Sequence, residues 1–493
     1  MNHMSRPFFL AAGLVCLALA VAFADTTYIA TKSAQIPGQF SKLQPGDTLL
    51  IQPGTYNYPS VCSSYRDGTA EKPIVARAAA PNTVFIKHSN EEMFVANHRY
   101  YIIENLNING MGYASVVIKF NDNGLTGGQY WQMRNCILTQ FGESSVKAGW
   151  SLTCTNDNYP GDFSILEGNE ITSDTLGIAG NGNGFNLDGP EHMVIRNNWI
   201  HDLVRSQGSS AGDLTYSGFF KGGAAHNIIE GNIIGPGQDM MGFCFGGGCM
   251  APGKFRDNRS YETDDIMYRN NVLLNIAHLE YTCGPNLNRK VYHNTIIYCT
   301  GTIAAEDIRN NLILGGTVTV NGGTNNYKST TYSSAYFWDP ANRNYALKTT
   351  ATALIGQVAR FDSVLTDKLG TARPAMVSYG AYEAYGTNPG TAVEVAASTL
   401  PEALTLDIQP NPVKSFATVR FALASPVRCL EVGIFDLNGR TVRVLYNGPL
   451  ASGAHRLRWD GRGHTSAPVA AGVYLVRLRI DARQSVKQFV YVR

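Results

Sequence analysis

The stretch SGFFKGGAAHNIIEGNII, residues 217–234, places one cation, Lys221, between two aromatic residues and two glycines, just before a short apolar strand. Similar stretches on either side supply further acids, cations and aromatic residues. The side chains of a type that could act as base, proton donor or charge-neutralising group are Lys221, Arg205, His226 and Tyr216. Such groups can remove a proton from the carbon next to a carboxylate, provided that a cation or a bound metal neutralises that carboxylate.

Further side chains in the same part of the sequence suit binding rather than chemistry. Cations and flat rings that could hold an acidic ligand are His192, Trp199, Lys254, Arg256 and Arg259. Asp188 and Asp213 offer the oxygen ligands that Ca²⁺ prefers, although no D-x-D-x-D loop contains them. Asp188 lies ten residues before Asn198 and Lys221 eleven before Asn232, so we expect the two side chains to be one residue out of step.

Each of these residues also has an ordinary structural explanation. A lysine before Gly-Gly at a corner is commonly a solvated turn residue, and the two histidines recur at repeat spacing, as stacked structural residues would. Aspartates in tight turns often bond to their own backbone. The residue types alone therefore leave both explanations open.

The elements that must position these side chains are short repeats between about residues 94 and 315. The recurring phrases are YIIENLNI, WQMRNCIL, ILEGNEI, MVIRNNWI, IIEGNII, MYRNNVLL, VYHNTII and DIRNNLIL. Each phrase consists of two short apolar strands around a polar corner rich in Asn and Gly, which tolerate a left-handed backbone. Apolar runs of three or four residues exclude helical repeats, and the period of about 30 residues predicts a parallel β-helix.

Two ladders of equivalent residues follow from this register. The corner positions are Leu106, Cys136, Asn169, Asn198, Asn232, Asn271, Thr295 and Asn311. We expect the asparagines at 198, 232 and 271 to bond along the stack. Six residues earlier the ladder reads Tyr100, Tyr130, Phe163, His192, His226, Asp265 and Arg289, so rings give way to polar groups in the middle coils. The last corner spacing, 16 residues, looks too short for a complete coil.

The composition indicates a secreted β-rich protein. Arg6, an apolar run and Ala22-Phe23-Ala24 predict a signal peptide over residues 1–24, and no later apolar run is long enough to span a membrane. Eight cysteines remain after cleavage, of which Cys244 and Cys249 are close enough in sequence to bridge. Residues 25–400 carry a net charge of −6, which argues against nucleic acid as a partner.

The opening of this region carries a resemblance. The segments LQPGDTLLIQPGTY, DGTAEKPIVARAAAPNTVFI and YYIIENLNING resemble β-helical polysaccharide lyases of the chondroitinase B and alginate lyase kind. With the middle coils and the closing GTARPAMVSYGAYEAYG, the likeness covers about 28–386. It implies a right-handed parallel β-helix domain over 25–386 and cleavage of uronic-acid glycans by β-elimination. Lys221, Arg205, His226 and Tyr216 would then be catalytic, and Asp188 and Asp213 would hold Ca²⁺.

A second resemblance covers the end of the chain. After a linker at 387–404, alternating apolar residues and regular turns in 405–493 predict a small β-sandwich. LDIQPNPVKSFATVRFAL, VGIFDLNGRTVRVL and APVAAGVYLVRLRI resemble the sorting domain of the type IX secretion system. This resemblance implies an exported protein, secreted or held at the cell surface, that passes the periplasm and outer membrane with that machinery as partner. We expect it to be a monomer.

Two other functions fit the same sequence. β-Helical polygalacturonases hydrolyse glycosidic bonds with two or three carboxylates, but their N-T-D, G-H-G and R-I-K motifs are absent here. A non-catalytic surface protein could bind glycans through aromatic platforms such as Trp131, Trp150, Trp199 and Tyr216. We rank the lyase level with the binding protein and above the hydrolase.

Overall fold

The computed structural model describes most of the chain after the predicted signal peptide. The described residues are 25–89, 92–111, 116–120, 128–141, 144–148, 161–173, 182–203, 215–246, 255–390, 406–409, 411–414, 416–423, 427–436, 441–450, 453–463, 468–480 and 483–492. The predicted signal peptide and most of the predicted linker lie outside them. Among the described residues, no helix is long and apolar enough to cross a membrane.

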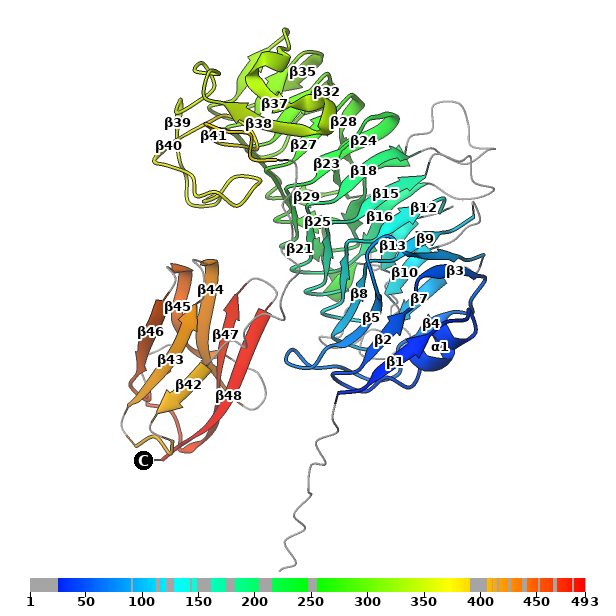
Figure 1. The fold of residues 1–493 in the computed structure, drawn as a ribbon. Helices are drawn as coiled ribbons and strands as arrows, with labels where there is room; N and C mark the ends of the chain where they lie inside the picture. The colour runs from blue at the N-terminus through cyan, green and yellow to red at the C-terminus, as the bar shows by residue number, and fades with distance from the viewer. Residues whose placement is uncertain are drawn as a thin grey trace, which may run out of the picture.

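Residues 25–330 form a parallel β-helix in which successive coils add one strand to each of three sheets (Figure 1). Sheet A contains β1 (Thr27–Ala30), β2 (Thr48–Ile51), β5 (Ile74–Ala78), β8 (Tyr101–Glu104), β11 (Gln132–Arg134), β14 (Ile165–Glu167), β17 (Val194–Arg196), β22 (Ile228–Glu230), β26 (Met267–Arg269), β30 (Lys290–Tyr292) and β33 (Asp307–Arg309). Sheet B contains β3 (Gly54–Asn57), β6 (Val84–Lys87), β9 (Asn107–Asn109), β12 (Ile137–Thr139), β15 (Glu170–Ser173), β18 (Trp199–Leu203), β23 (Ile233–Ile234), β27 (Val272–Leu274), β31 (Thr295–Ile297), β34 (Leu312–Leu314) and β36 (Tyr327–Ser329).

The third sheet carries the segments that the sequence singled out. Sheet C contains β4 (Cys62–Ser63), β7 (Glu92–Ala96), β10 (Val116–Phe120), β13 (Ser144–Ala148), β16 (Asn183–Asp188), β20 (Phe219–Lys221), β24 (Gly237–Phe245), β19 (Thr215–Tyr216) and β28 (Ile276–Thr282). A short helix, α1 (Gln35–Phe40), packs at the first coils and buries Ile36 and Phe40. The three sheets enclose one apolar core, so the predicted β-helix is confirmed.

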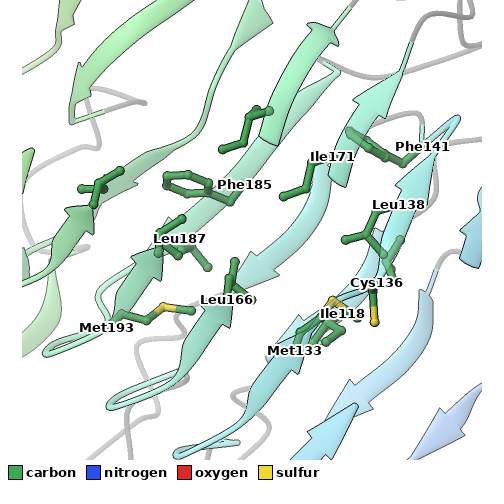
Figure 2. Packing of buried hydrophobic residues seen from close by; sticks show 14 of the residues in the cluster. Ile118, Met133, Cys136, Leu138, Phe141, Leu166, Ile171, Phe185, Leu187 and Met193 are labelled. Carbon is green, nitrogen blue, oxygen red and sulfur yellow. The ribbon is translucent and has the colours of Figure 1, made fainter. Parts of the chain in front are cut away.

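Alternation of side chains decides which residues fill that core. On β16, Phe185 and Leu187 point into the interior, where they pack with Leu166 and Met193 of the next wall (Figure 2). Because successive residues of a strand face opposite sides, Asp188 lies on the outer surface. The apolar phrases of the repeat thus form the interior, and the residues between them become available at the surface.

The predicted asparagine ladder is confirmed. Amide side chains bond from coil to coil at 2.8–3.0 Å through Asn169, Asn198, Asn232, Asn271, Asn294, Asn311 and Asn326. The prediction placed Thr295 in this row, one residue too far along. The corner spacing from Asn294 to Asn311 belongs to a complete short coil, in which β30, β31 and β32 (Thr300–Ile303) pair with β33, β34 and β35 (Thr317–Val320). The expectation that this coil is too short is wrong.

The ring ladder is also confirmed over its first five members. Neighbouring rings of Tyr100, Tyr130, Phe163, His192 and His226 are stacked with centroids 4.5, 5.0, 5.1 and 5.2 Å apart. All five residues have a positive φ. Asn288, which also has a positive φ, takes the last position in place of Arg289.

The C-terminal region folds as the predicted antiparallel sandwich. One sheet joins β42 (Leu406–Gln409), β43 (Ala417–Leu423) and β46 (Gly453–Trp459). The other joins β45 (Thr441–Leu450), β44 (Val427–Phe435), β47 (Gly472–Ile480) and β48 (Arg483–Tyr491). The sandwich has its own apolar core around Val432 and Trp459.

Candidate functional site

Sheet A has an outer face whose charges neutralise one another. Directly opposed residues on successive strands alternate in sign, and the row reads Arg77, Glu104, Arg134, Glu167, Arg196, Glu230 and Arg269. Ion pairs at 3.6, 2.8 and 2.7 Å join Arg77 to Glu104, Arg196 to Glu167 and Arg269 to Glu230. A face built this way stabilises the stack and offers little net charge to a ligand.

Sheet B has an outer face that the end of the β-helix domain covers. Val272, Leu312 and Leu314 form one apolar cluster with Phe337 and Leu347, which belong to β37 (Phe337–Asp339) and β38 (Asn344–Lys348). The later coils of sheet B are therefore closed to a ligand. Sheet C remains as the face on which a site could form.

Lys221 and Asp188 meet on that face. They are direct partners in the register between β20 and β16, and Lys221 Nζ lies 3.3 Å from Asp188 Oδ1. The expectation that they are one residue out of step is wrong. The extra residue is taken up in the corner after Lys221, where Gly222 and Gly223 both adopt a positive φ.

Aromatic rings surround this ion pair. Lys221 Nζ lies 5.4 Å from the centroid of the Phe219 ring, a distance at which a cation is attracted to the ring face. The rings of Tyr216 and Phe219 form an edge-to-face contact with their centroids 5.3 Å apart. The rings of Tyr281 and Tyr216 form a similar contact with centroids 4.8 Å apart. The structure thus joins Lys221 and Asp188 of the predicted site, and Tyr216 contacts the Phe219 ring that lies next to Lys221.

Asn186 adds an unfilled hydrogen-bond acceptor. It lies two residues before Asp188 on the same outer side of β16 and opposite Phe219 in the register. Its side-chain oxygen is buried and has no hydrogen-bond partner in the part of the chain that the structure describes. Leaving such an atom unpaired costs about 1–3 kcal/mol, so a bound hydroxyl group would be stabilised there.

The two histidines lie elsewhere, on the ring ladder at the corner between sheets C and A. His192 is stacked between Phe163 and His226, and burial lowers its pKa to about 4, so it is neutral at pH 7. A hydrogen bond of 3.0 Å to Asp265 raises the pKa of His226. No described contact joins either ring to Lys221, so the structure does not place them in one site with it.

The two described arginines of the predicted binding set hold the fold together. Arg256 is 7% exposed and bonds both oxygens of Asp162, at 2.8 and 2.9 Å, and the Gly189 carbonyl. Arg259 bonds the Gly223 carbonyl at 2.7 Å and lies 2.5 Å from Glu191. Their guanidinium groups are thus committed to neighbouring coils, while their predicted contact with a ligand stays a prediction.

The predicted aromatic platforms differ in how exposed their rings are. Trp131 is 1% exposed and belongs to the core, so it cannot bind a sugar at the surface. The His201 ring is stacked on the Trp199 ring with centroids 3.5 Å apart, and the Arg343 guanidinium carbon lies 3.6 Å from the Trp199 ring centroid. These two groups occupy much of the indole surface. Tyr216 is half-buried and contacts the rings of Phe219 and Tyr281. Arg205, Asp213, Lys254 and Trp150 lie outside the described residues.

The described residues do not fit a calcium ion at this site. Asp188, the described member of the predicted pair, already faces the Lys221 ammonium. No three His, Cys, Asp or Glu side chains gather closely enough for a metal within the described ranges. A calcium site that includes Asp213 stays a prediction.

The cysteines differ from expectation in one respect. Cys244 is a buried free thiol, so the bridge to Cys249 that the sequence spacing allows does not form. Cys62, Cys136 and Cys299 are also buried and free. Cys283 is disulfide-bonded.

Comparison with known proteins agrees with this architecture. Residues 31–234 match the Chondroitinase B family model. Residues 413–482 match the FlgD Ig-like domain model. The first match ends just beyond the coil that carries Lys221, so all residues of the candidate site except Tyr281 lie within it. No curated protein matches the chain.

Solved structures similar to the chain include several lyases. Pectate lyase Pel9A covers 74% of this chain and 97% of its own, with 13% identity and a TM-score of 0.49. An alginate lyase from a Paenibacillus species covers 62% and 99%, with 13% identity and a TM-score of 0.37. A rhamnogalacturonan lyase covers 67% and 98%, with 13% identity and a TM-score of 0.39.

Sequence reasoning missed Asn186, Phe219 and Tyr281. A signal for two of them was present, since the alternation in NGFNLD places Asn186 beside Asp188 and that in FFK places Phe219 beside Lys221. Tyr281 comes from a later coil, and nothing in its own sequence neighbourhood marks it.

Proposed function

We propose that the β-helix is a polysaccharide lyase that cleaves uronic-acid glycans by β-elimination on the outer face of sheet C. The observation that carries this proposal is the Lys221–Asp188 pair beside the unfilled acceptor of Asn186. A held ammonium group suits a substrate carboxylate, and a buried acceptor suits a sugar hydroxyl. The family-model match over residues 31–234 supports the same reaction class.

The reaction needs a proton removed from C5 of a uronic acid and a bond broken at O4. In the proposed site the Lys221 ammonium pairs with the C6 carboxylate and stabilises the negative charge that develops as the proton leaves. Tyr216, whose ring contacts the same Phe219, takes the C5 proton and returns one to the departing O4 oxygen. The electrons of the C–H bond form the C4=C5 double bond, so no oxidant or water is consumed.

A second candidate is a glycan-binding surface protein. The observation that favours it is that Asp188 already balances Lys221, which leaves the pair neutral overall and able to bind sugars without reacting. The ring cluster of Tyr216, Phe219 and Tyr281 would serve such binding equally well.

A product assay separates the two candidates. The full chain is incubated with alginate, pectate, chondroitin and a neutral glucan, and the ultraviolet absorbance of the C4=C5 double bond is followed with and without chelator. Absorbance that grows on a uronan supports the lyase. Measurable binding to a uronan with no such product on any polymer supports the binding protein and contradicts the lyase.

We also propose that the sandwich directs export through the type IX secretion system, so that the β-helix works outside the cell. The sequence likeness of 405–493 and its separate core support this role. Deleting residues 405–493 should trap the β-helix inside cells of a host that has this system. Equal amounts of both forms in the medium would contradict it.

A further inference from the structure

The strands β42, β43 and β46 form one sheet of the sandwich (Figure 1), and two of them carry outward arginines. Val419 and Trp459 of this sheet are buried in the core of the sandwich. Alternate residues therefore occupy outward positions, and these include Arg420 and Arg458. Arg420 and Arg458 are exposed.

The two exposed arginines are neighbours on this face. Arg458 is the register partner of Thr418, which lies two residues before Arg420 on the same side of β43, so Arg420 and Arg458 are diagonal neighbours. Asp407 lies opposite Arg420 on β42, and its carboxylate bonds Lys487 at 2.6 Å. Two neighbouring cations attract an anionic ligand.

The two exposed arginines are also available for bonding. The guanidinium groups of Arg420 and Arg458 make no hydrogen bond or ion pair with any described residue, whereas their backbone belongs to the strand pairing. The Arg458 guanidinium lies 4.0 Å from the ring centroid of Phe416, which is itself 43% exposed. A guanidinium stacked on an exposed ring is held flat, and its N–H groups remain free to bond two oxygens of one carboxylate.

The charge of the two halves of the chain points the same way. Residues 401–493 carry a net charge of +7, whereas residues 25–400 carry −6. A polyanion is therefore repelled by the β-helix as a whole and attracted by the sandwich. A second binding module in the same chain raises the local concentration of polymer at the first.

We propose that the face that carries Arg420 and Arg458 binds carboxylated polysaccharide and retains it for the β-helix. The choice of polymer rests on the proposed function, while the binding itself does not. The face would serve this role for as long as the sandwich stays attached to the β-helix.

The test is affinity electrophoresis of the full chain in gels that contain alginate or a neutral glucan. The double variant Arg420→Gln/Arg458→Gln is compared with Lys32→Gln/Lys328→Gln, which removes the same charge from exposed positions on the β-helix. We expect the arginine variant alone to bind alginate roughly 3- to 10-fold more weakly, since exposed charge pairs contribute about 0.2–1 kcal/mol each.

Two results would overturn the proposal. One is equal alginate affinity of the arginine variant and wild type, with circular dichroism showing both folded. The other is equal retardation of wild type by the neutral glucan. Because binding is measured without cleavage, a loss of affinity supports the arginine face even if the lyase assay is silent.

Discussion

Lys221 and Asp188 face each other across neighbouring coils, with Nζ 3.3 Å from Oδ1 and only 16% and 13% of their side chains exposed. An ion pair in this position fixes the ammonium on the open face of the β-helix instead of leaving it in solvent. Changing either partner should therefore impair the site, and the loss should be larger for Lys221 than for Asp188.

Replacing Asp188 with Asn should lower kcat on a uronan about 10-fold, because the ammonium is no longer held in place and small displacements of a reacting group are costly. Chelator should affect neither wild type nor variant. Kinetics on the polymer cleaved by wild type measure both effects, with Asp362→Asn as a control at an exposed site. Calcium dependence that disappears in Asp188→Asn would instead make Asp188 a metal ligand.

Replacing Arg256 with Gln should destabilise the fold. The change leaves the Asp162 carboxylate, 4% exposed, without the guanidinium that bonds both its oxygens, a loss worth about 3–5 kcal/mol. Thermal unfolding should show a much lower Tm than for Arg259→Gln, whose guanidinium is more exposed. An unchanged Tm with weaker binding to uronan would show that Arg256 serves the ligand.

The loss of stability caused by His226→Gln should depend on pH. The Asp265 hydrogen bond raises the folded-state pKa of His226, so the protonated ring stabilises the fold below the unfolded-state pKa. That contribution is lost as pH rises through the raised folded-state pKa. We expect the variant to be less stable than wild type at pH 5, by under about 1 kcal/mol since the ring is exposed, and the difference to shrink at pH 8.

Urea unfolding at the two pH values measures this difference. His278→Gln is a suitable control, since His278 is exposed and makes no described side-chain hydrogen bond. A difference that grows from pH 5 to pH 8 would contradict the assigned role of the Asp265 bond.

The fold was predictable because the sequence pattern that determines it is local and recurs in each coil. Each coil carries the same apolar strands and polar corner, so the Asn232 ladder and the ring stack through Tyr130 follow from spacing alone. The register slipped at Asn294, where two neighbouring polar residues both fit the corner and only the backbone pairing decides between them.

The site was harder to predict because it depends on corners and on distant coils. The coil of Lys221 has one extra residue in its corner, at Gly222–Gly223. Counting residues back from the asparagine corner therefore placed Lys221 and Asp188 one residue out of step, although they are direct partners. Arg256 reaches Asp162 across 94 residues of sequence, so its structural role had no local signal. Residue type identified the coil that matters, but it could not separate a group that holds the fold from one that faces a ligand.

The central claim is that the Lys221 ammonium neutralises a substrate carboxylate. The most direct test is kcat/KM of Lys221→Gln and Lys221→Arg on the uronan that wild type cleaves, with folding checked by circular dichroism. We predict a loss of about 100-fold or more for Lys221→Gln and a smaller loss for Lys221→Arg, which keeps the charge. Wild-type kcat/KM in Lys221→Gln would contradict the account.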